Sequence, residues 1–204
     1  MPKPPERNFL EAFLTNAEVI FDSYLDNDAV RSVPVIGTAL KLCKGVDDLR
    51  TRALGAKLAK FLSEPSLQSP RAKARMQRLA SHESEQIRIG ETLFLVIEKM
   101  TDLEKPRLLA MMFAAFLADV INASTLRRLT HAIDVAYIDD LHTLLESGNL
   151  SSDLGGALVA AGLVAPIGGK SWNDVGSINY TTTALALDFR SAYEFALNDG
   201  KSEA

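Results

Sequence analysis

Apolar residues recur every three or four positions along most of the chain, which is the spacing of one buried face on an α-helix. This spacing predicts five successive helices before residue 148, over about 8–25, 34–61, 70–97, 105–120 and 124–147. The fourth of them is apolar on almost every side, so we expect it to be buried at the centre of a helical bundle.

Two signals for helix starts support these bounds. Thr101 and Glu104 form a T-x-x-E capping box just before the fourth helix. Ser124 is placed to cap the fifth helix, because a serine hydroxyl can accept a hydrogen bond from a free N–H of the first turn.

The pattern changes after residue 147. A short helix is expected over 151–162, followed by β-prone segments at 163–167 and 178–182 with a Gly- and Asn-rich loop between them. A last amphipathic helix follows over 184–197. The order helix, helix, strand, loop, strand is typical of a winged helix-turn-helix.

These elements predict a mainly α protein: a multi-helix bundle with a C-terminal winged-helix-like module that contains a short β-hairpin. We expect four regions along the chain, namely a disordered tail over 1–7, a helical region over 8–147, the module with its final helix over 148–198, and a tail over 199–204.

Composition narrows the class of protein. Hydrophobic residues make up 47% of the 204 residues and charged residues 24%, which excludes a wholly disordered or collagen-like chain. The single cysteine, Cys43, cannot form an intramolecular disulfide, and this fits a reducing cytoplasm. The N-terminus shows no signal-peptide pattern, and no apolar run reaches the ~20 residues of a membrane span. We therefore expect a cytoplasmic protein.

Charge is unevenly distributed along the chain. Residues 41–78 hold ten basic and three acidic residues, a net charge of +7, whereas residues 131–204 hold three basic and ten acidic residues, a net charge of −7. The two parts could attract each other within the fold or across a dimer. The helix over 151–162 has no basic residue and one acid, Asp153, although DNA recognition relies on Lys and Arg for phosphate contacts. We therefore expect the winged-helix-like module either to contact protein or to serve as a packing module.

The basic segment is the candidate site for an anionic partner. The residues that would bind this partner are Lys57, Lys60, Arg71, Lys73, Arg75 and Arg78. Nucleic acid, a lipid surface and the protein's own acidic half all fit such a cluster. A solvated helix face is the alternative that needs no partner.

No complete catalytic or cofactor motif is present. Gly169-Lys170-Ser171 ends like a phosphate-binding loop, but that loop needs a glycine at position 164, where this chain has Val164. No G-x-S-x-G sequence is present to supply a nucleophilic serine. We therefore expect no enzyme activity, no cofactor and no small-molecule substrate.

Two His/Asp pairs at i, i+3 spacing have metal-ligand chemistry. They are His131 with Asp134, and Asp139 with His142. On one continuous helix the pairs lie roughly 80° apart, and a metal site in a bundle would need further carboxylates from other helices. Capping and ion-pair roles explain these residues more simply, so we expect no metal.

Several short motifs resemble a family of bacterial proteins. They are Val33-Pro-Val-Ile-Gly-Thr-Ala-Leu-Lys, the run from Lys105 to Phe116, and the ending Ala161-Gly-Leu-Val with Tyr180-Thr-Thr-Thr. With helices leading to a winged-helix-like end, the chain resembles the abortive-infection alpha proteins. It departs from them where a glycine often follows the last threonine, because Ala184 stands there. The resemblance implies a bacterial cytoplasmic protein of phage defence and no catalytic residue.

The resulting hypothesis is a non-enzymatic interaction or regulatory protein of bacterial phage defence, with a protein partner or self-association. Two alternatives stay open. One is a nucleic-acid-binding protein that uses the basic 41–78 segment, with affinity that falls steeply as salt rises. The other is a membrane-surface effector in which the glycine-bearing helix over 34–60 lies on anionic lipid.

Overall fold

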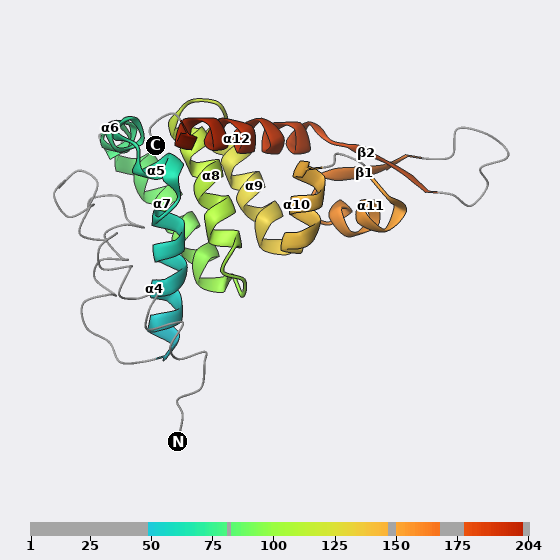
Figure 1. Cartoon of the computed structure of the whole chain (residues 1–204), viewed down its shortest axis with the longest axis horizontal. Helices are drawn as coiled ribbons and strands as arrows, with labels where there is room; N and C mark the ends of the chain where they lie inside the picture. The colour runs from blue at the N-terminus through green and yellow to red at the C-terminus, as the bar shows by residue number, and fades with distance from the viewer. Residues whose placement is uncertain (1–48, 81–82, 147–149, 168–177, 202–204) are drawn as a thin grey trace, which may run out of the picture.

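The computed structural model describes residues 49–80, 83–146, 150–167 and 178–201. These residues form nine helices and one two-stranded antiparallel hairpin near the C-terminal end (Figure 1). They confirm the mainly α fold with a winged-helix-like module. Several expected features lie outside the described residues. They are the tail over 1–7, the helix over 8–25, the segment over 33–48 with its Val33-Pro-Val-Ile motif and Cys43, the loop over 168–177, and the end of the expected tail over 202–204.

The described chain runs through eleven elements. The bundle contains α4 (Leu49–Leu62), α5 (Pro65–Gln68), α6 (Pro70–Ala80), α7 (Glu83–Lys99), α8 (Lys105–Leu117) and α9 (Ala123–Val135). The remaining elements are α10 (Ile138–Glu146), α11 (Ser152–Val159), β1 (Val164–Ile167), β2 (Asn179–Thr182) and α12 (Ala184–Lys201). In this part of the chain, no helix combines the length and the apolar character that crossing a bilayer demands.

Two of the expected helices are each divided in the structure. The helix expected over 70–97 is α6 followed by α7, and the one over 124–147 is α9 followed by α10. The second break lies at Ala136, whose backbone is extended (φ −80°, ψ 155°), and Tyr137 beyond it is 79% exposed. Periodicity predicted one helix because α9 and α10 both bury apolar residues in the same core.

Neighbouring residues replace both expected caps. α9 begins after Asn122, whose side-chain oxygen accepts a hydrogen bond from the Thr125 N–H at 2.9 Å, and Ser124 already lies inside the helix. Glu104 precedes α8 without a side-chain cap of its own. Its backbone N–H instead donates to the Asp102 carboxylate at 2.6 Å. In both places an Asn or Asp side chain closer to the turn accepts the bond.

α8 is the centre of the hydrophobic core, as its sequence predicted. All of its residues are buried except Lys105, Arg107 and Phe116. α4, α9 and α12 pack against it. The Phe113 ring lies 6.0 Å from that of Phe61 and 6.1 Å from that of Phe116, measured between centroids, so aromatic packing joins α8 to α4.

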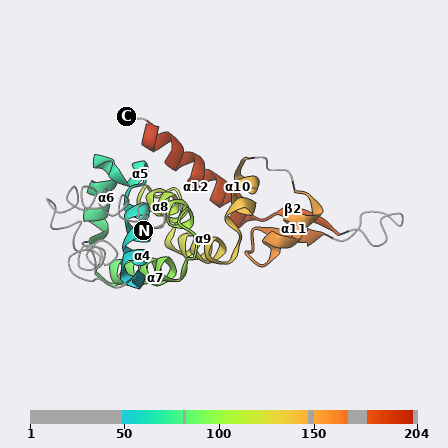
Figure 2. The same ribbon diagram turned by 60° about the horizontal axis from the view of Figure 1, so that its bottom comes forward.

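α12 joins the two regions expected on either side of residue 147. It runs from the hairpin along the bundle to α5 and packs against α9 and α8 on the way (Figures 1 and 2). One continuous core contains buried residues from α4 through α12. The helix continues to Lys201, past position 198, because its last turn packs on α5: a Cβ built on Gly200 would lie 3.2 Å from the Cβ of Pro65.

α11 and the hairpin are the first elements of the winged-helix-like module expected over 148–198, and α10 precedes them. β1 and β2 pair with Val164 opposite Thr182, within the two segments that the sequence predicted. Gly162, at φ 70°, turns the chain after α11 in the left-handed region that favours glycine. α11 packs against both strands, and Gly155 lets its backbone approach the ring of Tyr180.

Candidate functional site

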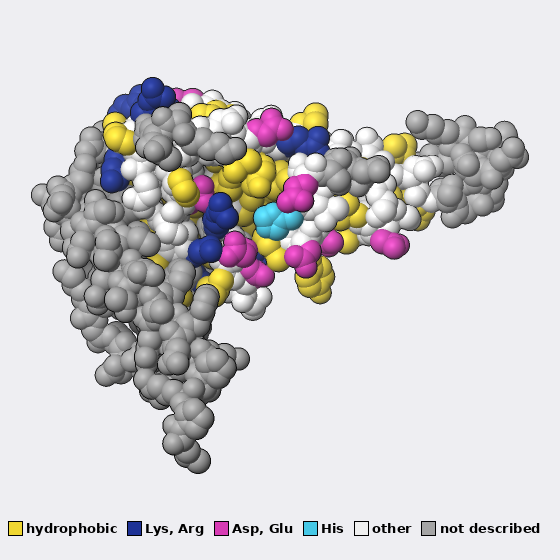
Figure 3. Space-filling model, viewed as in Figure 1, with side chains coloured by type: hydrophobic (Ala, Val, Ile, Leu, Met, Phe, Trp, Pro, Cys, Tyr) yellow, Lys and Arg dark blue, Asp and Glu magenta, His cyan; other side chains and the backbone are white. Residues whose placement is uncertain are grey.

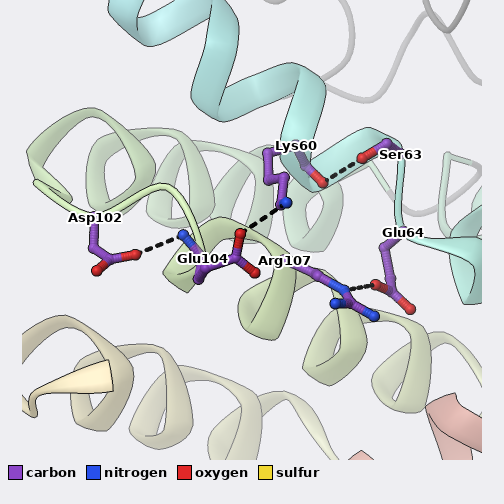
Figure 4. A network of polar contacts seen from close by, with 6 residues as sticks. All are labelled: Lys60, Ser63, Glu64, Asp102, Glu104 and Arg107. Atoms are coloured by element: carbon purple, nitrogen blue, oxygen red, sulfur yellow. Dashed lines mark hydrogen bonds and ion pairs between the residues drawn. The ribbon is translucent and has the colours of Figure 1, made fainter. Parts of the chain in front are cut away.

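Two of the six basic residues selected from the sequence lie on α4 and bind other parts of the protein. The Lys57 ammonium donates a hydrogen bond of 2.8 Å to the carbonyl of Glu98, near the end of α7. The Lys60 ammonium lies 2.8 Å from the carboxylate of Glu104, just before α8 (Figure 4). Both lysines therefore hold α4 against its neighbours in the bundle.

The other four selected residues lie on α6. Arg71 and Arg78 are exposed, whereas Lys73 and Arg75 are half-buried. The Arg75 guanidinium lies 5.9 Å from the centroid of the Phe195 ring on α12, and Lys73 and Arg78 also make contacts within the protein. Two of the six residues therefore hold α4 in the bundle, and the other four make α6 a basic helix. Figure 3 shows Lys and Arg side chains gathered over α6.

A buried carboxylate lies beside these residues. The Glu64 side chain is 3% exposed and accepts a hydrogen bond of 2.9 Å from Nε of Arg107, whose side chain is 48% exposed (Figure 4). This hydrogen bond, and the attraction of Glu64 that adds to it, raise the pKa of Arg107 above its ordinary value. A charged group with so little access to water must be paired, so this contact is structural.

The exposed face of α11 consists mainly of small side chains and carries one charge. Its exposed residues, with the residue that follows the helix, are Ser152, Asp153, Gly156, Ala157, Val159 and Ala160. In a helix-turn-helix the corresponding helix enters the major groove of DNA. Lys and Arg make the phosphate contacts that supply much of the affinity there, and α11 has neither over Ser152–Val159.

A cleft of about 340 Å³ opens where α9, the turn after α11 and the start of α12 meet. α9 contributes Ser124, Arg127, Arg128 and His131. The turn contributes residues 160–162, and α12 contributes a residue of its first turn, Leu185. The cleft therefore has one cationic wall and a wall of small and apolar residues.

Sequence reasoning missed the arginines of this cleft. It weighed His131 as a metal ligand or as a capping and ion-pair residue, and it gave Arg127 and Arg128 no role. A partial signal was present, because Arg127 and His131 are four residues apart and so share one helix face. The opposite wall comes from residues 160–162 and Leu185, and no local pattern indicates that these segments meet α9.

Within the ranges that the structure describes, no three His, Cys, Asp or Glu side chains come together as a metal would require. The His/Asp pairs considered above lie on two separate helices, α9 and α10. No family model, curated protein or solved structure matches this chain. Its function must therefore be inferred from its own residues and contacts.

Proposed function

We propose that the protein is a non-enzymatic interaction protein of the cytoplasm, and that its winged-helix-like module contacts protein through α11. The exposed face of α11 carries this proposal, because it combines small uncharged residues with the single acid Asp153. Small side chains let another surface approach the helix closely, and the missing Lys and Arg remove the main source of affinity for DNA.

A second copy of the chain is the partner that its charges favour. α6 carries four basic residues and no acid, and it lies at the opposite end of the described molecule from α11 (Figures 1 and 2). Asp139 and Glu146, both exposed on α10, add to the negative charge of Asp153 in the module. A contact between the basic end of one copy and the acidic end of the next is head-to-tail, so it can repeat along a chain of copies or close into a ring.

Sedimentation velocity of the full chain tests this proposal at low and high salt (about 0.05 and 0.5 M), where exposed charges are weakly and strongly screened. We expect species larger than the 22.2 kDa monomer at low salt, and monomer at high salt. Ala157→Arg should give monomer at both, because it adds a positive charge to the exposed face of α11. Ser191→Arg, an exposed site on α12, is the control with the same added charge and should assemble as the original protein does.

Two results would contradict the proposal. A protein that is monomeric at both salt concentrations does not associate with itself. Assembly that Ala157→Arg leaves unchanged does not use α11. DNA binding is measured in parallel by fluorescence anisotropy with a labelled duplex, and we expect Ala157→Glu to leave the signal unchanged. If the original chain binds the duplex and Ala157→Glu does not, α11 would instead be a DNA-reading helix.

The nucleic-acid alternative through the basic segment has less support. It needs cations available to phosphates, but the Lys57 ammonium is bonded to a carbonyl and Lys60 is paired with Glu104. The basic residues of α6 then remain, and they are fewer than the cations that the whole segment offered for following a phosphate backbone. The membrane-surface alternative involves the helix expected over 34–60, which is described only from residue 49 onward.

The short motifs that resemble the abortive-infection alpha proteins support bacterial phage defence as the setting of the proposed function. Phage plating on cells that express the protein tests this setting. We expect fewer plaques with the original chain and with Ser191→Arg, and normal plaque numbers with Ala157→Arg. Equal plating on cells with and without the protein, across a panel of phages, would remove phage defence from the proposal.

A further inference from the structure

We propose that the cleft between α9 and α12 binds a small organic phosphate of about mononucleotide size. This site lies apart from the exposed face of α11 and goes beyond the protein-contact role proposed above. Arg127, Arg128 and His131 line the cleft on one side, and residues 160–162 and Leu185 line it on the other.

The cationic wall is the first argument. Arg127 and His131 lie one helical turn apart on α9, with Arg128 beside them. Among the residues that the structure describes, no carboxylate forms an ion pair with either arginine. A guanidinium matches the oxygens of a phosphate with two parallel hydrogen bonds.

The start of α12 adds to this attraction. α12 has 18 residues, and Leu185 in its first turn lines the cleft. The aligned peptide dipoles of a helix favour negative charge at its first turn. Thr183 fixes this end in place, because its hydroxyl donates to the carbonyl of Gly162 at 2.8 Å and accepts from the Ala186 N–H at 3.3 Å.

Size and lining limit the class of ligand. A volume of about 340 Å³ lies at the lower end of the range for small-molecule sites. Ala160, Ala161 and Leu185 offer an apolar wall for the organic part, opposite the arginines that would hold the phosphate. A nucleic-acid strand would need further cations to follow its backbone, and the neighbouring α11 has only an acid, Asp153.

Isothermal titration calorimetry with the full chain tests the proposal. The probes are adenosine 5′-monophosphate, ribose 5-phosphate, inorganic phosphate, adenosine, and a single-stranded DNA oligonucleotide. We expect saturable binding of adenosine monophosphate, competition by inorganic phosphate, and no binding of adenosine. Arg127→Ala should weaken the binding about tenfold or more, because it removes a charge-assisted contact. Arg127→Lys should weaken it less, since it keeps the charge but loses the two parallel bonds.

Lys99→Ala is the control, because it removes an exposed cation from the end of α7, outside both proposed binding surfaces, and should leave the affinity unchanged. Ala157→Arg should also bind as the original chain does, which separates this site from self-association through α11. Circular dichroism melts show whether each variant folds, and Arg128→Ala replaces Arg127→Ala if the latter does not, because Arg128 is exposed. The proposal is wrong if no phosphate probe binds, if adenosine binds as well as its monophosphate, if only the oligonucleotide binds, or if folded cleft variants bind normally.

Discussion

Replacing Arg107 with glutamine should destabilise the protein by about 2 kcal/mol, because it leaves the Glu64 carboxylate buried without its partner. The Glu64 side chain is 3% exposed and that of Arg107 48%. Breaking a fully buried ion pair costs ~3–5 kcal/mol, and losing a surface pair costs at most ~1 kcal/mol. With one partner buried and the other half in water, the cost should lie between these limits. For a chain of this length the melting temperature should then fall by roughly 4–8 °C.

A double-mutant cycle measured by urea denaturation isolates this pair. The variants are Arg107→Gln, Glu64→Gln and the double variant, and we expect a coupling free energy of about 1.5 kcal/mol or more between the two side chains. Lys60 and Glu104 provide the control in the same region, because their side chains are 26% and 49% exposed (Figure 4). Their cycle should give less than ~1 kcal/mol. Equal coupling in the two cycles would refute the reasoning that burial decides the strength of these pairs.

The raised pKa of Arg107 sets the pH range over which this coupling should persist. A base whose pKa is higher in the folded state stabilises the fold at every pH below its unfolded pKa, and the contribution is lost only as the pH rises through the folded pKa. For arginine both values lie far above neutral pH. Deprotonation of Arg107 should therefore not reduce the coupling between pH 6.5 and pH 9. A coupling that declines over this range would mean that another titrating group supports the contact.

Four further substitutions should change stability, and their effects can be measured by thermal or urea denaturation. Gly155→Ala should cost about 1–3 kcal/mol, because its Cβ would lie 2.4 Å from ring carbons of Tyr180. Gly156→Ala is the control one residue further on, because its Cβ would lie at an ordinary contact distance of 3.5 Å from the Tyr180 hydroxyl. It should stabilise α11 by up to ~1 kcal/mol, and a loss of stability would contradict the packing of α11 on Tyr180. Phe113→Ala should cost ~3–5 kcal/mol, as expected for an aromatic ring that is 1% exposed, and a cost below ~1.5 kcal/mol would argue against a central α8. Asn122→Ala should cost about 1 kcal/mol by removing the cap of α9, and an unchanged midpoint would exclude that cap.

Local patterns were enough to predict the parts of the fold that local physics decides. α8 is apolar on almost every side and is buried on almost every side. The two β-prone segments pair with Val164 opposite Thr182, and Gly162 has the positive φ that a glycine after a helix suggests. The division at Ala136 escaped prediction because α9 and α10 face the same core, and the apolar spacing therefore continues across the turn. The cap of α9 was assigned to the wrong residue because Asn122 and Ser124 are both suitable N-cap residues, and only the path of the chain decides which of them caps the helix.

Electrostatics was the least predictable property, because a segment's net charge ignores which groups meet in space. The sequence grouped Lys57 and Arg75 as one cationic cluster, but the fold places the first against α7 and the second over an aromatic ring of α12. Arg127 and Arg128 received no role from the sequence, and the acidic Asp134 follows them closely in the chain. On α9 that closeness brings no ion pair among the described residues, and the arginines line a cleft completed by segments more than 30 residues away. The strongest candidate for binding an anion therefore lies outside the basic 41–78 segment, since availability to a partner depends on three-dimensional neighbours rather than on local charge density.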